Sequence, residues 1–206
     1  MSQGLDGSLR TLGIDDGYFP VYFKEGKLKT LIVGVVCSGL TPVNLAIDLI
    51  TVDGLDGTEA ALRVYRRLVP VDIVVLDGVT YAGFNVIDPE VMVNEAGVPV
   101  IVIFKHDLDI NRVYRALVKH FSDWEYRFKV IKEVYEKSRE YPTPWRPIRI
   151  ALYKISSIEA LKIVTDLQNT SPIPEPLRLA DVIASGLTKG TKLLNLINRG
   201  RLGIGA

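Results

Sequence analysis

The segment from residue 71 to residue 88, VDIVVLDGVTYAGFNVID, constrains the fold of this chain more than any other stretch. Residues 71–76 are nearly all aliphatic and half β-branched, which is typical of a strand buried on both faces in the middle of a sheet. Asp77 follows this apolar run directly, and Gly78 allows the backbone to turn. A carboxylate at the C-terminal end of a central strand lies where open α/β sheets bind their ligands. Because an Asp-Gly pair is also ordinary turn chemistry, a functional interpretation needs other polar groups at the same edge.

Composition limits the class of protein. With 206 residues, of which 48% are hydrophobic and 24% charged, the chain is long enough for one good core, and we predict a single domain over residues 1–206. Asp48 and Asp53 interrupt the longest apolar stretch, and the N-terminus lacks a basic-then-apolar signal pattern. We therefore expect a cytoplasmic protein with no membrane partner. The single cysteine, Cys37, excludes an internal disulfide and a cysteine-rich metal site.

The charges are unevenly distributed, although the net charge is only +1. Residues 1–111 contain 8 Lys and Arg against 15 Asp and Glu, whereas residues 112–149 contain 10 against 5. Residues 182–206 contain 4 basic residues and no acidic residue. This pattern suits a polyanion held by the basic segments beside an acidic metal site. The alternative is that the later helices only have solvated charged faces.

The periodicity of the apolar residues predicts a mixed α/β fold. Short turns join three expected strands in an antiparallel meander. Strand, helix and strand then alternate, which implies right-handed crossovers and parallel pairing. The expected strands cover residues 10–14, 28–37, 43–52, 71–77, 98–104 and 148–155. The expected helices cover residues 58–69, 89–96, 109–120, 123–139, 157–167 and 175–185, before a basic tail. A meander followed by parallel β/α units and flanked by helices describes a ribonuclease H-like mixed sheet.

Several carboxylates are expected near the edge where the strand at residues 71–77 ends. Asp15 or Asp16 ends the first strand, and neighbouring strands lie only about 4.8 Å apart. Where the third strand gives way to a helix, three more acidic residues follow, namely Asp53, Asp56 and Glu59. Three such charges about 4 Å apart would repel by roughly 4 kcal/mol per pair at an effective dielectric constant near 20, so the site should either take up protons or bind a cation. Oxygen ligands favour Mg²⁺ or Mn²⁺, and ions in such a cluster activate water for phosphodiester hydrolysis. The alternative is structural, since Asp56 or Thr58 is also placed to cap the helix.

Four short motifs together resemble endonuclease V, in that family's order. They are GIDDGY at residues 13–18, VVLDG at 74–78, GVPVIVIFK at 97–105 and IPEPLRLAD at 173–181. The Asp-Asp-Gly, VDGLD and AGFNV segments look closer still to an uncharacterised archaeal family related to endonuclease V. The resemblance implies a ribonuclease H-like fold and metal-dependent hydrolysis of nucleic acid beside a deaminated base such as inosine.

The resemblance also implies roles for particular residues. Asp15 and Asp77 would be metal ligands, and the family's helix-start glutamate would fall on Glu59, or on Asp56 if the alignment slips. Lys105 would approach the phosphate, so the implied catalytic set is Asp15, Asp77, Glu59 and Lys105. Tyr18, from the first motif, and Asn85, which stands near the position of a missing H-P-R motif, are candidate substrate-binding residues.

The sequence departs from the endonuclease V pattern at three places. The strand-separating Tyr-Ile-Pro-Gly wedge is replaced by Leu-Ile-Thr-Val, and the H-P-R after the central aspartate is absent. The late G-H-R is replaced by Leu-Tyr-Lys at residues 152–154, and neither His106 nor His120 takes over that role. Two further functions therefore stay open. One is a catalytically inactive nucleic-acid-binding or regulatory protein of the same fold, and the other is a hydrolase of a small phosphorylated metabolite.

Overall fold

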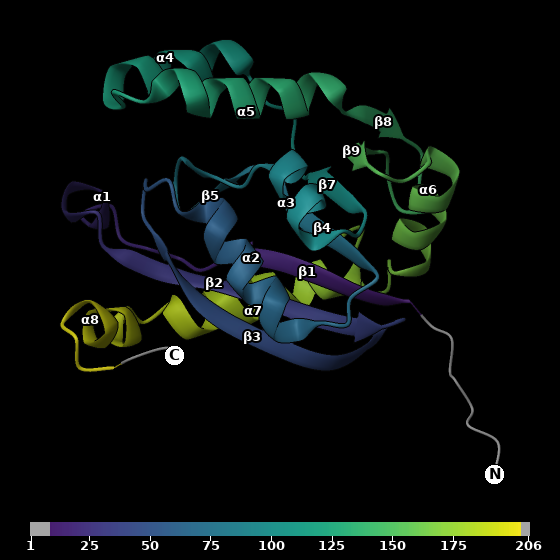
Figure 1. Cartoon of the computed structure of the whole chain (residues 1–206), viewed down its shortest axis with the longest axis horizontal. Helices are drawn as coiled ribbons and strands as arrows, with labels where there is room; N and C mark the ends of the chain where they lie inside the picture. The colour runs from purple at the N-terminus through teal and green to yellow at the C-terminus, as the bar shows by residue number, and fades with distance from the viewer. Residues whose placement is uncertain (1–8, 203–206) are drawn as a thin grey trace.

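The computed structural model describes residues 9–202, which build one seven-stranded mixed sheet and a two-stranded hairpin beside it (Figure 1). The strand order in the sheet is β3-β2-β1-β4-β7-β9-β8. Strands β1, β4 and β7 are parallel neighbours, and all other pairs in the sheet are antiparallel. The strands of the sheet are β1 (Arg10–Asp16), β2 (Lys29–Ser38), β3 (Thr41–Thr51), β4 (Ile73–Asp77), β7 (Val100–Phe104), β8 (Arg139–Tyr141) and β9 (Ile148–Tyr153). The expected antiparallel meander and parallel β/α units are confirmed, and the last long strand, β9, is antiparallel to β7.

Helices cover both faces of the sheet. The helices are α1 (Phe23–Gly26), α2 (Gly57–Leu68), α3 (Pro89–Ala96), α4 (Ile110–His120), α5 (Trp124–Lys137), α6 (Ser157–Asp166), α7 (Glu175–Thr188) and α8 (Lys192–Asn198). Side chains alternate between the two faces along a strand. A Cβ on Gly34 would meet Val64 of α2, whereas a Cβ on Gly13 would meet the backbone of α7, so α2 and α7 lie on opposite faces. Among residues 9–202, no helix is long and apolar enough to cross a membrane.

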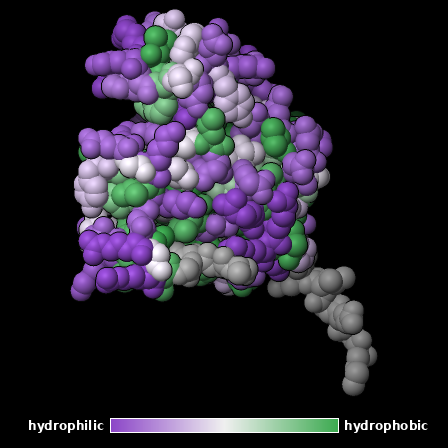
Figure 2. Space-filling view, turned by 60° about the vertical axis from the view of Figure 1, so that its left-hand side comes forward, coloured by the Kyte–Doolittle hydropathy of each residue, from purple (hydrophilic) through white to green (hydrophobic). Residues whose placement is uncertain are grey.

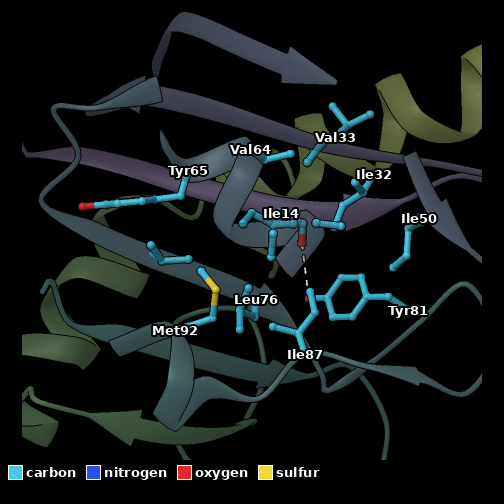
Figure 3. Packing of buried hydrophobic residues seen from close by; sticks show 14 of the residues in the cluster. Ile14, Ile32, Val33, Ile50, Val64, Tyr65, Leu76, Tyr81, Ile87 and Met92 are labelled. Atoms are coloured by element: carbon cyan, nitrogen blue, oxygen red, sulfur yellow. Dashed lines mark hydrogen bonds between the residues drawn. The ribbon is translucent and has the colours of Figure 1, made fainter. Parts of the chain in front are cut away.

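The core consists of aliphatic side chains from the central strands. On the α2 side, Ile14 and Leu76 pack with Met92 of α3, and all three are fully buried (Figure 3). On the opposite face, the alternate residues Ile73 and Val75 pack with other side chains, among them residues of α6 and α7. The expected burial on both faces is therefore confirmed for residues 73–76, whereas Asp72 is exposed. This packing holds the ends of β1, β4 and β7 rigidly at one edge.

Five short elements were not expected from the sequence. A loop was expected after Asp77, and the structure has a small hairpin there, made of β5 (Thr80–Tyr81) and β6 (Asn85–Val86). A helix, α8, lies where only a basic tail was expected, α1 forms between the first two expected strands, and β8 lies between α5 and β9. Elements this short have too few residues for a hydrophobic period, so only tertiary contacts reveal them.

Candidate active site

Three chemically active side chains meet at the carboxyl edge of the parallel strands. Asp15 lies at the end of β1, Asp77 ends β4, and Lys105 directly follows β7. The register pairs Ile14 with Leu76 and Asp77 with Ile103, so Asp15 and Asp77 lie at the same level of the sheet and Lys105 lies two residues beyond it. Because strand residues alternate between faces, Asp15, in phase with Gly13, points to the α7 side. Asp77 and Lys105 share that face for the same reason.

The ammonium group of Lys105 lies between the two carboxylates. Its Nζ is 3.5 Å from Oδ2 of Asp15 and forms a closer ion pair with Oδ2 of Asp77. The Asp15 side chain is only 9% exposed and that of Asp77 18%, so bulk water screens the pair weakly. The protonation of each of these three groups therefore depends on the charges of the other two.

Burial is the main reason why the acidic groups of the site hold their protons tightly. Burial, followed by repulsion from Asp77, raises the pKa of Asp15 to about 8, although Lys105 opposes the rise. Burial also raises the pKa of Asp77 above its usual value, again against the effect of Lys105. The two carboxylates in turn raise the pKa of the Lys105 ammonium, although burial of that group opposes the effect. Perturbed ionisable groups of this kind concentrate at functional sites.

Asp16 belongs to the same edge but points to the other face. Its Oδ2 accepts a hydrogen bond of 2.8 Å from the backbone N–H of Ala82 in the β5–β6 hairpin. Burial raises the pKa of Asp16 to about 7, and the Ala82 hydrogen bond lowers it in part. The Tyr81 hydroxyl, in the same hairpin, accepts from the backbone N–H of Asp77 at 2.7 Å and donates to the Ile14 carbonyl at 3.4 Å (Figure 3). The hairpin therefore ties together the ends of β1 and β4.

Asp181 of α7 also acts on this site. Its charge contributes to the raised pKa of Asp77, after the larger effect of burial, and also to that of Lys105. The residue reaches the site because α7 packs closely on β1, where a Cβ on Gly13 would collide with the backbone of Pro176 and Leu177. The sequence contained the signal, since Asp181 ends the IPEPLRLAD motif, but we had given it no site role.

The structure does not bring Asp56 or Glu59 to this pair. The Asp56 carboxylate accepts from Thr51 Oγ1 at 2.8 Å and from Asn85 Nδ2 at 2.6 Å. It stands at the N-cap position of α2 without capping the helix through its side chain. Glu59 is exposed on α2, where it pairs with Arg66 at 3.2 Å. The expected third carboxylate is therefore not supplied by either residue, because each is bonded elsewhere.

The two candidate substrate-binding residues, Asn85 and Tyr18, differ in their exposure to solvent. Asn85 is fully buried, and its amide joins the Gly57 N–H, the Thr51 carbonyl and Asp56. A side chain with this role holds the β5–β6 hairpin against α2, and substrate binding by Asn85 stays a prediction. Tyr18 is 52% exposed just beyond β1, where a substrate has access to it.

The carboxylate oxygens at this edge are the protein atoms that could bind the expected Mg²⁺ or Mn²⁺ ion. Among residues 9–202, no three Asp, Glu, His or Cys side chains form a group that encloses a metal ion. Asp15 and Asp77 nevertheless present oxygen atoms around a shared cation, the Lys105 ammonium. Mg²⁺ is commonly held by one or two carboxylates while water and substrate phosphate complete its shell. The pair therefore fits a Mg²⁺ or Mn²⁺ ion with two protein ligands.

Sequence comparison identifies the family. The model of the family described as Endonuclease dU matches residues 7–188. This chain belongs to the Endonuclease dU family. A UPF0215 protein of Thermococcus gammatolerans is 38% identical, with 92% of this chain and 97% of the relative covered. A UPF0215 protein of Methanothermobacter thermautotrophicus is 36% identical over 90% of this chain and 91% of the relative. The predicted relation to an archaeal family is confirmed, and membership supports a nuclease-like function.

Solved structures share the fold of this Endonuclease dU family member. A protein of unknown function from Archaeoglobus fulgidus superposes with a TM-score of 0.75 at 26% identity, covering 87% of this chain and 98% of that chain. Endonuclease V from Ciona intestinalis, crystallised with a 24mer DNA containing an inosine, gives a TM-score of 0.59 at 16% identity over 91% of this chain and 89% of that chain. Endonuclease V from Streptomyces avermitilis gives 0.59 at 15% identity over 90% and 83%. The predicted ribonuclease H-like fold is confirmed.

Proposed function

We propose that this protein is a divalent-metal-dependent endonuclease that hydrolyses a phosphodiester of nucleic acid beside a deaminated base. The observation that carries the proposal is the convergence of Asp15, Asp77 and Lys105 at the carboxyl edge of three parallel strands. The family name refers to dU, and the Ciona intestinalis endonuclease V was crystallised with inosine-containing DNA. Uracil and hypoxanthine, the base of inosine, both arise by deamination, which supports this class of substrate.

Asp15 and Asp77 would hold the Mg²⁺ or Mn²⁺ ion through their carboxylate oxygens. When bound, such an ion activates a water molecule and stabilises the charge on the leaving oxygen. The two residues are kept apart from bulk solvent and at fixed spacing by β1 and β4, which preorganises the site. Lys105 binds the anionic phosphate, because its charge is retained by the neighbouring carboxylates and its side chain is 27% exposed. Asp16 and Asp181 add negative potential that favours a cation.

One alternative has support from a specific observation. No third carboxylate joins Asp15 and Asp77 among residues 9–202, which would suit a protein that binds nucleic acid without cutting it. A hydrolase of a small phosphorylated metabolite is the other alternative. The same pair of carboxylates would serve it, because an anionic site does not define the length of its substrate.

The test is calorimetric titration of Mg²⁺ and Mn²⁺ into the wild type, Asp77→Asn and a control, Asp166→Asn. Asp166 lies on the exposed surface of α6 and pairs only with Lys162, so its loss should change nothing. Each protein is then incubated with DNA and RNA oligonucleotides that contain uracil, inosine or only unmodified bases. We expect metal binding and cleavage in the wild type and control, and neither in Asp77→Asn.

Other outcomes decide between the alternatives. Metal binding by the wild type without cleavage of any oligonucleotide would favour the binding protein or the metabolite hydrolase. Absence of metal binding in the wild type would refute metal-dependent catalysis at this pair. Equal cleavage by Asp77→Asn and the wild type would move the active centre elsewhere.

A further inference from the structure

The outer face of α4 carries three cationic side chains that have no partner. Arg112, Arg115 and Lys119 are all exposed, and α4 contains no acidic residue. Within residues 9–202, none of the three side chains makes an ion pair or a hydrogen bond. On the neighbouring helix α5, by contrast, Lys132 pairs with Glu136 at 3.7 Å and Lys137 pairs with Glu90 at 3.9 Å.

The three cations lie in one row. Their spacing of three and four residues places them on the same side of the helix, and seven residues of helix span about 10 Å. The inner side of α4 is occupied, since Leu117 is fully buried and Tyr114 makes edge-to-face contacts with Trp124 and Phe128 of α5. In Figure 2, the upper part of the molecule, where α4 and α5 lie, is covered mainly by hydrophilic side chains.

The row leads toward the β5–β6 hairpin, which ties together the ends of β1 and β4. Its C-terminal end continues into His120 and Phe121, which line a cavity of about 410 Å³ together with Lys24 and Lys27 beside α1. Asp53 and Phe84 also line this cavity, and the Phe84 N–H donates to Asp53 Oδ1 at 2.8 Å. Phe84 lies in the turn of the same hairpin whose Ala82 N–H binds Asp16.

We propose that Arg112, Arg115 and Lys119 bind the sugar–phosphate backbone of the nucleic-acid substrate outside the catalytic pair. The inference rests on the proposed function and names the surface that would hold the substrate. A row of about 10 Å matches roughly three nucleotide steps of 3.4 Å along one strand. Exposed cations whose side chains pair with no carboxylate among residues 9–202 complement a polyanion, and contacts to phosphates position the substrate without reading its sequence.

The test compares two variants that lose the same charge. One carries Arg112→Gln, Arg115→Gln and Lys119→Gln, and the control carries Lys29→Gln, Arg66→Gln and Lys162→Gln, three exposed cations of β2, α2 and α6 outside the basic segments. Binding of a labelled DNA duplex with a central deoxyuridine is measured against salt concentration in EDTA. Each phosphate contact contributes about 0.9 to the slope of log K against log salt. The α4 variant should therefore lose about 2 to 3 from the slope, and the control should lose less than about 0.5.

Cleavage measurements separate this inference from the proposed function. With Mg²⁺, the α4 variant should cleave the long duplex more slowly at low substrate concentration, with an increased KM and an unchanged kcat. If the wild type binds and cleaves but the α4 variant keeps its salt slope and KM, the α4 inference is wrong and the proposed function stands. Equal losses in both variants would show non-specific attraction and also refute it. If the wild type neither binds nor cleaves any nucleic acid, the proposed function itself fails, and an acidic protein becomes the partner to test.

Discussion

Replacement of Arg127 tests how the catalytic edge is held in place. The Arg127 side chain is only 3% exposed and lies at the first turns of α5. Its guanidinium donates to the carbonyls of Asp53, Gly54 and Phe84, at 3.1, 2.9 and 2.6 Å. It thus joins α5 to the turn after β3 and to the β5–β6 hairpin. Arg127→Met keeps most of the aliphatic volume but removes every one of these donors.

The expected magnitude follows from the acceptors left behind. Three carbonyls lose a charged donor, and each unsatisfied acceptor costs about 1 to 3 kcal/mol when buried. Water in the adjoining cavity can hydrogen-bond to some of these carbonyls. The Asp123 carboxylate, whose side chain is 34% exposed, can be hydrated after it loses Arg127. We therefore expect the free energy of unfolding to fall by about 3 kcal/mol, at the lower end of the range for a broken buried ion pair.

Urea unfolding of the wild type, Arg127→Met and Lys129→Met measures this change. Lys129 is an exposed residue of the same helix with no ion pair or hydrogen bond among residues 9–202, so its variant should stay within about 0.5 kcal/mol of the wild type. The amide of Ala82 should also exchange faster in Arg127→Met, because the hairpin loses its link to α5. A loss below about 1 kcal/mol for Arg127→Met would refute the reasoning, since the carbonyls would then be satisfied without the guanidinium.

Two further predictions concern β1. Burial raises the pKa of Asp16 from 3.8 to about 7, so the folded protein keeps this proton after the unfolded chain has released it, and stability falls as pH rises between these values. In EDTA, the free energy of unfolding of Asp16→Asn should therefore match that of the wild type near pH 4 and exceed it by about 2 kcal/mol at pH 8, a value reduced for partial solvent exposure. An equal difference at both pH values in urea unfolding would contradict this. Gly13→Ala would force a Cβ against the backbone of Pro176 and Leu177, which cannot rotate away. Its free energy of unfolding should fall by about 3 kcal/mol or more, and calorimetry showing an unchanged melting temperature would disprove the close packing of α7 on β1.

Local patterns were sufficient to locate most of the fold. Long apolar runs such as residues 28–37 and 71–76 identify strands, because burial on both faces needs apolar residues throughout. The helix expected over residues 89–96 has those bounds in the structure, since Asp88 caps its start and Gly97 adopts a left-handed conformation at its end. The two strands of the β5–β6 hairpin could not be predicted, because two residues are too few to show an alternating hydrophobic pattern.

Some residues of the candidate site could be located from the sequence, whereas the contacts of others could not. The strand ends predicted Asp77 and one of Asp15 and Asp16 at a common edge, because parallel neighbours end at one edge of a sheet. The choice of Asp15 and the role of Lys105 came from the resemblance to endonuclease V. Glu59 and Asp56 had the right residue type at the right sequence distance, yet their side chains bond to Arg66 and to Thr51 and Asn85. Asn85 lies 29 residues from Asp56 in the chain, so the direction of the Asp56 carboxylate depends in part on a distant partner.

The sequence by itself determined the central strands, the order of the β/α units, and the presence of Asp77 and of the Asp15-Asp16 pair at the ends of β4 and β1. Each of these follows from local periodicity and from the alternation of side chains along a strand. Only the tertiary structure decided that Asp16 faces the β5–β6 hairpin, that Asp181 reaches Asp77 from α7, and that Arg127 joins three separate segments. These relations depend on how helices and loops pack across the sheet, and packing joins residues whose separation in sequence holds no information about their distance in space.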